Sequence, residues 1–377
     1  VPVNVVHASF RGHFSDNPRA VYEGLVSRGV PATHTWLTAD SPRPRWPSGV
    51  RTAPFGSPEG IAALEAADLV VSNDCISTRW TKKPGTVYLQ TWHGTPLKRI
   101  HHDVPQRREQ WAGADRDVPR WDLLLSQNPA SSRLLRGAFG FGGPVHETGY
   151  PRNDVLSSPR RDQVRATARA RLGLDEGTTA VLYAPTWRDD LVLDGAGPRD
   201  FEFPLDLESL TARLGRDHTV LLRLHQMVRD RLDVPPGSAV LDVSDHPDIA
   251  ELYLAADVMI TDYSSAMFDF AVTGKPLLHY TYDLERYTEQ LRGLYFDLAE
   301  VAPAPLLSTS AEVVDALAEV DALAAATADR YARFRETFCP LDDGRATVRV
   351  LDLLADAGLP VGAVPDPARS TSEGDAP

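Results

Sequence analysis

The chain has 377 residues, a formal net charge of -13, and 42% hydrophobic and 24% charged residues. This length and composition describe a soluble globular protein with room for two domains of ordinary size, and no stretch reaches the roughly 18 apolar residues of a membrane span. The acidic balance argues against nucleic acid or an anionic membrane as a partner of the whole surface. Cys75 and Cys339 are too few for a disulfide framework or a cysteine-based zinc site, which favours a reducing cytoplasm.

The first part of the chain alternates between expected strands and helices. This βαβα rhythm predicts an open parallel sheet. The expected strands are Val3 to His7, Leu69 to Ser72, Val87 to Gln90 and Leu123 to Ser126, with helices at Pro18 to Arg28 and from Ser131 to Gly137.

A second unit of the same kind is expected after the turn-rich segment Glu147 to Asp154. A charged helix from about Arg160 to Leu172 precedes a new strand at Val181. We therefore divide the chain into residues 1–150 and 151–357, with Val348 to Ala357 as an amphipathic closing helix of the second domain. Residues 358–377 are rich in Pro, Gly, Ser and acid, and we expect them to be disordered because they cannot bury a core.

Four segments end a buried strand in an abrupt polar break, which is where open parallel sheets bind ligands. In the first, His93 follows an apolar run and precedes Gly94. Taken alone, His93 fits a packing residue as well as a reactive imidazole. The segments are YLQTWHGTPLKRIHHD from Tyr88, VLYAPTWRDD from Val181, VLLRLHQ from Val220 and VMITDYSSAMFDFAVTGKP from Val258.

The fourth segment predicts an anion site. A strand that ends in Asp-Tyr-Ser-Ser and continues into a helix from about Ala266 exposes unpaired N–H groups, and the hydroxyls of Ser264 and Ser265 add donors. Alternatively, one serine only caps the helix. Asp269 lies further along the helix, and it can likewise be interpreted as a capping carboxylate.

Further donors for an anion are expected opposite the first segment. If the third segment stays extended, Arg223 and His225 share one face and can point at the same phosphate, although His225 alone also fits a strand-end residue. Thr186 and Arg188 follow the strand at Val181 and can add to this site. Arg188 beside two aspartates also fits a surface ion pair.

We predict no metal held by the protein. The carboxylate pairs read as turn or capping acids, and His101 and His102 are expected to diverge on a helix or strand, which makes them poor joint ligands. The segment from Lys98 to Arg120 carries six cations with His and Trp between them. It fits either a solvated surface or a local site for a polyanionic acceptor or lipid headgroups. The carboxylate pairs are Asp189 with Asp190, Asp245 with Asp248, and Asp342 with Asp343.

Several segments in order, within residues 3 to 352, resemble the CDP-glycerol glycerophosphotransferase family, which builds the polyol-phosphate chains of teichoic acids and related capsules. The resemblance implies a GT-B-like α/β fold, with two doubly wound parallel-sheet domains facing across a cleft. Residues 1–150 would form the acceptor side and 151–357 would bind the nucleotide donor. The segments are FRGHFSDNPRAVYEGL, QTWHGTPLKRI, TGYPRND, YAPTWRDD, LLRLH, ITDYSSAMFDFAVTGKP and DDGRATVRV.

The resemblance implies transfer of a polyol phosphate, glycerol phosphate first of all, from CDP-glycerol or CDP-ribitol to a hydroxyl of a polyol-phosphate polymer or lipid-linked primer, with release of CMP. His93, beside Gly94, would be the general base, and His225 would stabilise charge on the phosphoryl oxygens or on the leaving CMP. Asp269 would bind the ribose hydroxyls of the donor, and the segment around Asp248 would border the cytosine. The other donor contacts would be Arg223, Thr186, Arg188, Ser264 and Ser265.

No cofactor is expected to be held by the protein, and Mg²⁺ carried in on the donor diphosphate is left open. Such an acceptor predicts a cytoplasmic enzyme with peripheral membrane contact. Two alternatives remain: a GT-B glycosyltransferase that uses a nucleotide sugar and releases a nucleoside diphosphate, and a non-catalytic domain that binds anionic polymer. The sequence does not distinguish a glycerol donor from a ribitol donor or priming from polymerisation, and it does not give the oligomeric state.

Overall fold

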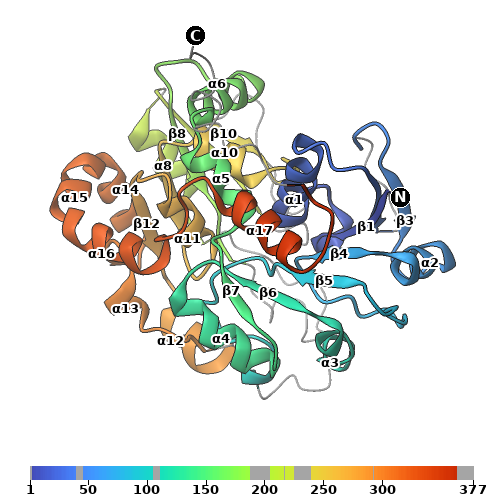
Figure 1. Cartoon of the computed structure of the whole chain (residues 1–377). Helices are drawn as coiled ribbons and strands as arrows, with labels where there is room; N and C mark the ends of the chain where they lie inside the picture. The colour runs from blue at the N-terminus through green and yellow to red at the C-terminus, as the bar shows by residue number, and fades with distance from the viewer. Residues whose placement is uncertain are drawn as a thin grey trace, which may run out of the picture.

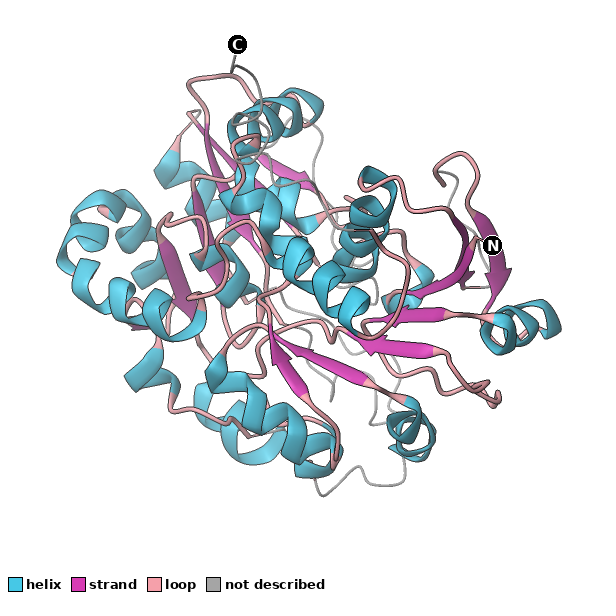
Figure 2. Ribbon diagram, in the orientation of Figure 1, coloured by secondary structure: helices cyan, strands magenta, loops and turns pink. Residues whose placement is uncertain are grey.

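The computed structural model describes residues 2–39, 46–104, 111–186, 204–215, 217–224, 239–291 and 293–362. Within these residues the chain forms two α/β units, each built on one sheet whose strands pair in parallel (Figures 1 and 2). This arrangement confirms the predicted α/β, doubly wound fold class.

The described part of the N-terminal sheet has seven strands in the order β3-β2-β1-β4-β5-β6-β7. The order reverses between β1 and β4, where the crossover connections leave to opposite sides, and such a switch point is where open sheets bind ligands. The strands are β1 Val3–Ala8, β2 Ala32–Thr38, β3 Arg51–Pro54, β4 Leu69–Ser72, β5 Val87–Gln90, β6 Leu123–Ser126 and β7 Val145–Glu147. The helices are α1 Asp16–Ser27, α2 Pro58–Ala66, α3 Ala112–Asp117 and α4 Pro129–Phe139.

The described C-terminal sheet repeats this plan with six strands in the order β10-β9-β8-β11-β12-β13, reversing between β8 and β11. The strands are β8 Thr179–Tyr183, β9 His218–Leu222, β10 Val240–Asp242, β11 Val258–Thr261, β12 Leu277–Tyr280 and β13 Leu306–Leu307. The helices are α5 Asp154–Ser157, α6 Arg161–Arg171, α8 Leu207–Leu214, α10 Ile249–Ala255, α11 Ala266–Ala271, α12 Leu284–Arg286, α13 Leu298–Val301, α14 Ser310–Ala318, α15 Val320–Ala326 and α16 Ala328–Phe338.

Helices cover both faces of each sheet, so the central strands are apolar on both sides. Successive residues of β1 show this, because Val5 belongs to one hydrophobic cluster and Val6 to the cluster on the opposite face. Strand β4 is buried at every position. Because these buried strands are parallel, the polar segments that follow them lie together at one edge of each sheet.

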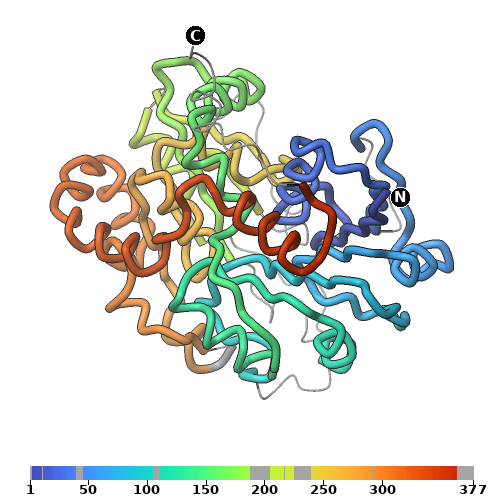
Figure 3. The backbone as a smooth tube through the Cα atoms, in the orientation of Figure 1, coloured from blue at the N-terminus to red at the C-terminus, as the bar shows by residue number. Residues whose placement is uncertain are grey.

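The last helix, α17 (Ala346–Asp356), packs on the N-terminal unit instead of closing the C-terminal one. Figure 3 shows the red end of the chain lying against the blue α1. Leu351 and Leu354 share a hydrophobic cluster with Val5 of β1. Leu359 and Val361 are buried in the same cluster, so these two residues are packed where we expected disorder. Residues 363–377 lie outside the described part of the chain.

Candidate functional site

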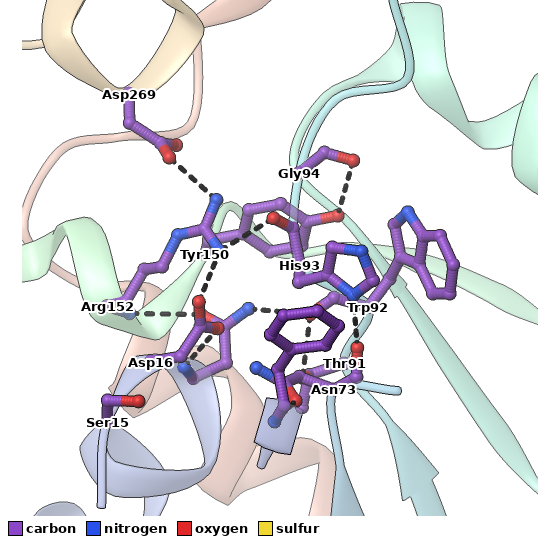
Figure 4. Close-up of polar contacts among 12 residues, drawn as sticks. Ser15, Asp16, Asn73, Thr91, Trp92, His93, Gly94, Tyr150, Arg152 and Asp269 are labelled. Carbon is purple, nitrogen blue, oxygen red and sulfur yellow. Dashed lines mark hydrogen bonds and ion pairs between the residues drawn. The ribbon is translucent and has the colours of Figure 1, made fainter. Parts of the chain in front are cut away.

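His93 lies in the loop that leaves β5, at the carboxyl end of the N-terminal sheet (Figure 4). The loop turns sharply because Trp92 has a φ of 53°. The Trp92 ring stacks on the imidazole, with ring centroids 4.1 Å apart, and Phe10 lies 5.9 Å away at a tilt. These two rings limit the orientations open to the imidazole.

A hydrogen bond assigns the proton on this imidazole. Nδ1 of His93 lies 2.5 Å from the carbonyl oxygen of Asn73, which follows β4 at the switch point. A carbonyl oxygen only accepts, so Nδ1 carries the hydrogen and the lone pair is left on Nε2. His93 is therefore held in the tautomer that a general base needs.

Gly94 brings this loop into contact with the C-terminal domain. A Cβ atom built on Gly94 would lie 2.7 Å from Oγ and 2.9 Å from Cβ of Ser265. Both distances are shorter than van der Waals contact, so the two loops meet where only glycine leaves room. The structure thus joins the predicted base loop to the predicted anion site of the other domain.

The start of α11 matches the serine pattern in part. Ser264 Oγ accepts a hydrogen bond from the N–H of Ala266, the first residue of α11, at 3.2 Å. The N-cap residue is Ser265, whose side chain makes no capping hydrogen bond within the described residues. Asp262 Oδ1 accepts from the N–H groups of Thr186, at 2.8 Å, and Tyr263, at 2.6 Å. Thr186 is therefore tied through its backbone N–H to the Asp-Tyr-Ser-Ser segment, and its contact with a donor stays a prediction.

Arg223 and Asp248 support the loop that leads into α10. Arg223 Nη1 donates to the carbonyl oxygens of Val243, at 3.2 Å, and His246, at 2.9 Å. Asp248 caps α10 through the Ala250 N–H and pairs with Arg19 of α1 at 3.0 Å. Their contacts with a donor stay predictions. His225 and Arg188 lie outside the described residues, as do Arg107 and Arg108.

Arg152, which sequence reasoning assigned no role, connects three parts of the interface (Figure 4). It lies in the 3₁₀ turn Pro151–Asn153. Nη1 donates to Asp16 Oδ2, at 2.7 Å, and to the carbonyl oxygen of His93, at 2.8 Å. Nη2 donates to Asp269 Oδ2 at 2.6 Å. In the sequence, Arg152 stands out only as part of the segment TGYPRND. A residue in a turn belongs to no helical or strand periodicity, so the pattern of the sequence does not predict its contacts.

Asp269 has a role that the sequence did not suggest. It is 3% exposed, and besides Arg152 it accepts from Asn153 Nδ2, at 2.8 Å, and Gln127 Nε2, at 3.2 Å. These donors come from the N-terminal unit and the crossing between the units. The expected contact with ribose hydroxyls stays a prediction, and in this arrangement the carboxylate holds the domains together.

A second carboxyl group shares these donors. Asn153 Nδ2 lies 3.1 Å from Asp342 Oδ1, and Gln127 Nε2 lies 3.3 Å from Asp342 Oδ2. We expected Asp342 to be a turn or capping acid, but it is 8% exposed inside the interface. Burial raises the pKa of Asp342 to about 7, against hydrogen bonds from Asn153 and Gln127 that lower it.

The expectation that His101 and His102 diverge is wrong. Their ring centroids lie 4.2 Å apart. The reason is local, since the chain here forms a 3₁₀ turn, His101–Asp103, in which His101 has a φ of 47°. Neither a regular helix nor a strand sets the directions of these side chains.

Two doubly wound sheets, with a histidine loop of one touching a serine-lined helix start of the other, define an α/β protein of the GT-B-like class. Residues 2–356 match the model of the CDP-Glycerol:Poly(glycerophosphate) glycerophosphotransferase family. The chain belongs to this family of transferases, as the resemblance implied.

Relatives and solved structures agree with this assignment. The chain is 36% identical to a teichoic acid glycerol-phosphate transferase of Staphylococcus aureus, over 91% of this chain and 90% of the relative. It is 34% identical to a teichoic acid poly(glycerol phosphate) polymerase of Bacillus subtilis, covering 94% of this chain and only 48% of that protein. The structure of the wall teichoic acid polymerase TagF superposes with a TM-score of 0.85 at 32% identity, over 94% of this chain and 89% of that one. Among the described helices, none is both long and apolar enough for a membrane span.

Proposed function

We propose that this protein transfers glycerol phosphate from CDP-glycerol to a hydroxyl of a polyol-phosphate polymer or a lipid-linked primer. The attacking oxygen forms a bond to the phosphorus that carries the glyceryl group, the bond to CMP breaks, and His93 Nε2 takes the hydroxyl proton. The observation that carries this proposal is the contact between His93 Nδ1 and the Asn73 carbonyl, because it leaves Nε2 as the proton acceptor.

Charge neutralisation is the second part of the proposed mechanism. Ser265 lies against Gly94 at the domain contact, and Thr186 is hydrogen-bonded through its backbone N–H to Asp262 of the same segment. We propose that the hydroxyls of Thr186, Ser264 and Ser265 donate hydrogen bonds to a diphosphate there. Roles for Arg223, His225 and Arg188 on the same phosphates rest on the sequence. We propose that the transfer itself uses no protein-held cofactor, with Mg²⁺ entering on the donor diphosphate where it takes part.

The products separate this function from its alternatives. We expect CMP release when the protein is incubated with CDP-glycerol and a polyol-phosphate primer. CDP-ribitol in a parallel reaction tests the choice of donor, and reactions without primer test priming. Release of CDP or UDP from a nucleotide sugar would instead support a glycosyltransferase. Polymer binding without any nucleotide product would contradict the proposal and support a non-catalytic domain.

We propose that the acceptor reaches His93 along the basic segment Lys98 to Arg120. The start of this segment is held against the C-terminal domain, because the Arg99 N–H donates to the Gly293 carbonyl at 3.1 Å and the Tyr295 N–H to the Leu97 carbonyl at 2.8 Å. Since the net charge is -13, attraction of a polyanion must come from such a local patch. A lipid-linked acceptor would bring the protein to the inner face of the membrane.

Charge reversal at Arg107 and Arg108 tests this route. We expect a higher KM for a polymeric acceptor, unchanged CDP-glycerol binding, and a weaker salt dependence of KM than in the wild type. Charge reversal at Arg161, an exposed arginine of α6, is the matched control. Unchanged acceptor kinetics in the Arg107 and Arg108 variant would mean that the acceptor enters elsewhere.

A further inference from the structure

Two histidines and one aspartate form a compact cluster after the histidine loop, outside the transfer site. The cluster joins the 3₁₀ turn His101–Asp103 to α3. His102 Nε2 lies 2.7 Å from Asp115 Oδ1, and His101 Nε2 lies 3.6 Å from the same oxygen. All three donor atoms lie within 4.8 Å of one another.

His101 is oriented as metal-binding histidines are. Its Nδ1 lies 3.1 Å from the carbonyl oxygen of Ala138 in α4, so Nδ1 carries the hydrogen and the lone pair is on Nε2. A backbone carbonyl in this position fixes the tautomer and the ring direction of a metal-binding histidine. Phe139 and Trp111 hold the ring, with centroids 4.9 and 5.2 Å away.

The other nitrogen of His101 faces an acceptor. The residue is 2% exposed, and within the described residues Nε2 is buried with no hydrogen-bond partner. A lone pair on Nε2 and a carboxylate oxygen 3.6 Å away repel each other unless a positive charge lies between them, and burying an unpaired polar atom costs free energy. A cation held by both atoms would remove both penalties.

We propose that His101, His102 and Asp115 bind a divalent cation of the zinc class. Two imidazole nitrogens and one carboxylate oxygen suit zinc better than calcium or magnesium, which prefer oxygen ligands. A tetrahedral ion with ligands at about 2.0 to 2.1 Å separates them by about 3.3 Å, between the two distances observed here. The ion would replace the hydrogen bond between His102 Nε2 and Asp115 Oδ1.

The ion would have a structural role. His102 and Asp115 are 45% and 46% exposed, so a metal can enter from solvent and a water can complete the coordination. The ligands stand on both sides of residues 105–110 in the chain, and binding would tie the turn after the histidine loop to α3. This would fix the 3₁₀ turn and α3, which both lie within the basic segment, relative to each other.

Metal binding to the full chain tests the proposal without an activity assay. After chelator treatment, we expect one equivalent of Zn²⁺ to bind in competition with a chromophoric indicator, and Co²⁺ to give the visible absorption of a tetrahedral site. Asp115→Asn and His102→Asn should each weaken Zn²⁺ binding at least about tenfold. Both side chains are half exposed, so these variants are expected to fold.

Asp321→Asn is the matched control, because it removes an exposed carboxylate on α15 far along the chain. Zn²⁺ should raise the melting temperature of the wild type and of this control, but not of Asp115→Asn. Less than one equivalent of bound Zn²⁺, or equal affinity in the wild type, Asp115→Asn and His102→Asn, would overturn the assignment. Circular dichroism of the metal-free variants separates lost ligation from lost folding.

Discussion

At the scale of single residues, the imidazole of His93 is the group on which turnover should depend most. It is expected to take a proton in the transition state and to add little to donor binding. His93→Ala should therefore lower turnover at least about 100-fold and change the affinity for CDP-glycerol little. His146→Asn, in edge strand β7, is a control for loss of a histidine elsewhere in the same sheet. Wild-type turnover in His93→Ala would remove the assignment.

Gly94 sets how closely the two loops approach. The φ of Gly94 is not positive, so among the described residues the obstacle to alanine is the Ser265 side chain. Gly94→Ala should push the loops apart and lower kcat/KM at least about tenfold, since small displacements in a site are costly. Ser265→Gly removes both clashing atoms, but it also removes a hydroxyl that is proposed to bind the diphosphate, so this variant needs its own baseline. Gly94→Ala should therefore lower kcat/KM much less when it is added to Ser265→Gly than when it is added to the wild type. CMP release by the two single variants and the double variant checks this, and an equal loss in both backgrounds argues against the contact.

Residues directly after strands could be predicted from the sequence, and residues in turns could not. His93, Gly94 and Ser264 follow apolar runs whose ends are visible in the sequence. Arg152 follows no such run, and its partners Asp16 and Asp269 lie 136 and 117 positions away. A local pattern does not encode a contact between such distant residues.

At the scale of elements, helix α17 was assigned to the C-terminal domain but packs on the N-terminal one. Its amphipathic pattern predicted a helix that packs on the body, and this was correct. The pattern describes an apolar stripe but does not name the surface that covers it. That surface is the cluster around β1 and α1. By contrast, the expected strands at Leu69 to Ser72, Val87 to Gln90 and Leu123 to Ser126 are confirmed as β4, β5 and β6.

The place of α17 predicts which leucines stabilise the N-terminal unit. Leu354 is completely buried, whereas Leu353 on the same helix is only partly buried. Leu354→Ala should lower the free energy of unfolding by about 2 to 5 kcal/mol, and Leu353→Ala by clearly less. Denaturant unfolding of the two variants gives the comparison. Equal losses would mean that α17 is loosely packed on this core.

At the scale of the whole molecule, the shared carboxyl groups make the interface sensitive to pH. Asp342 has a pKa of about 7 in the folded protein and about 4 in an unfolded chain. The stability that this raised pKa contributes is fully present below about pH 4 and is lost as pH rises through about 7. Between pH 5 and pH 8 the free energy of unfolding should fall by about 1 to 3 kcal/mol.

Asp342→Asn should flatten this dependence, because an amide does not titrate, although it keeps only one of the two acceptor oxygens. Asp343→Asn is the neighbouring control, since Arg349 bonds that exposed carboxylate and lowers its pKa. Unfolding by denaturant at pH 5 and pH 8 compares the three proteins. If Asp342→Asn keeps the wild-type slope, another group is responsible.

The return of the chain to its starting domain makes that domain discontinuous in sequence. The segment that leaves this domain and the segment that returns to it are hydrogen-bonded to each other. Asp154 accepts hydrogen bonds from the N–H groups of Ala346, at 2.8 Å, and Thr347, at 2.7 Å. The C-terminal unit is thus an insertion with neighbouring ends. A fragment of residues 1–150 would expose the apolar surface that α17 covers. Exchange of C-terminal units between family members should therefore succeed as an internal cassette of about residues 154–345 and fail as a simple fusion at residue 150.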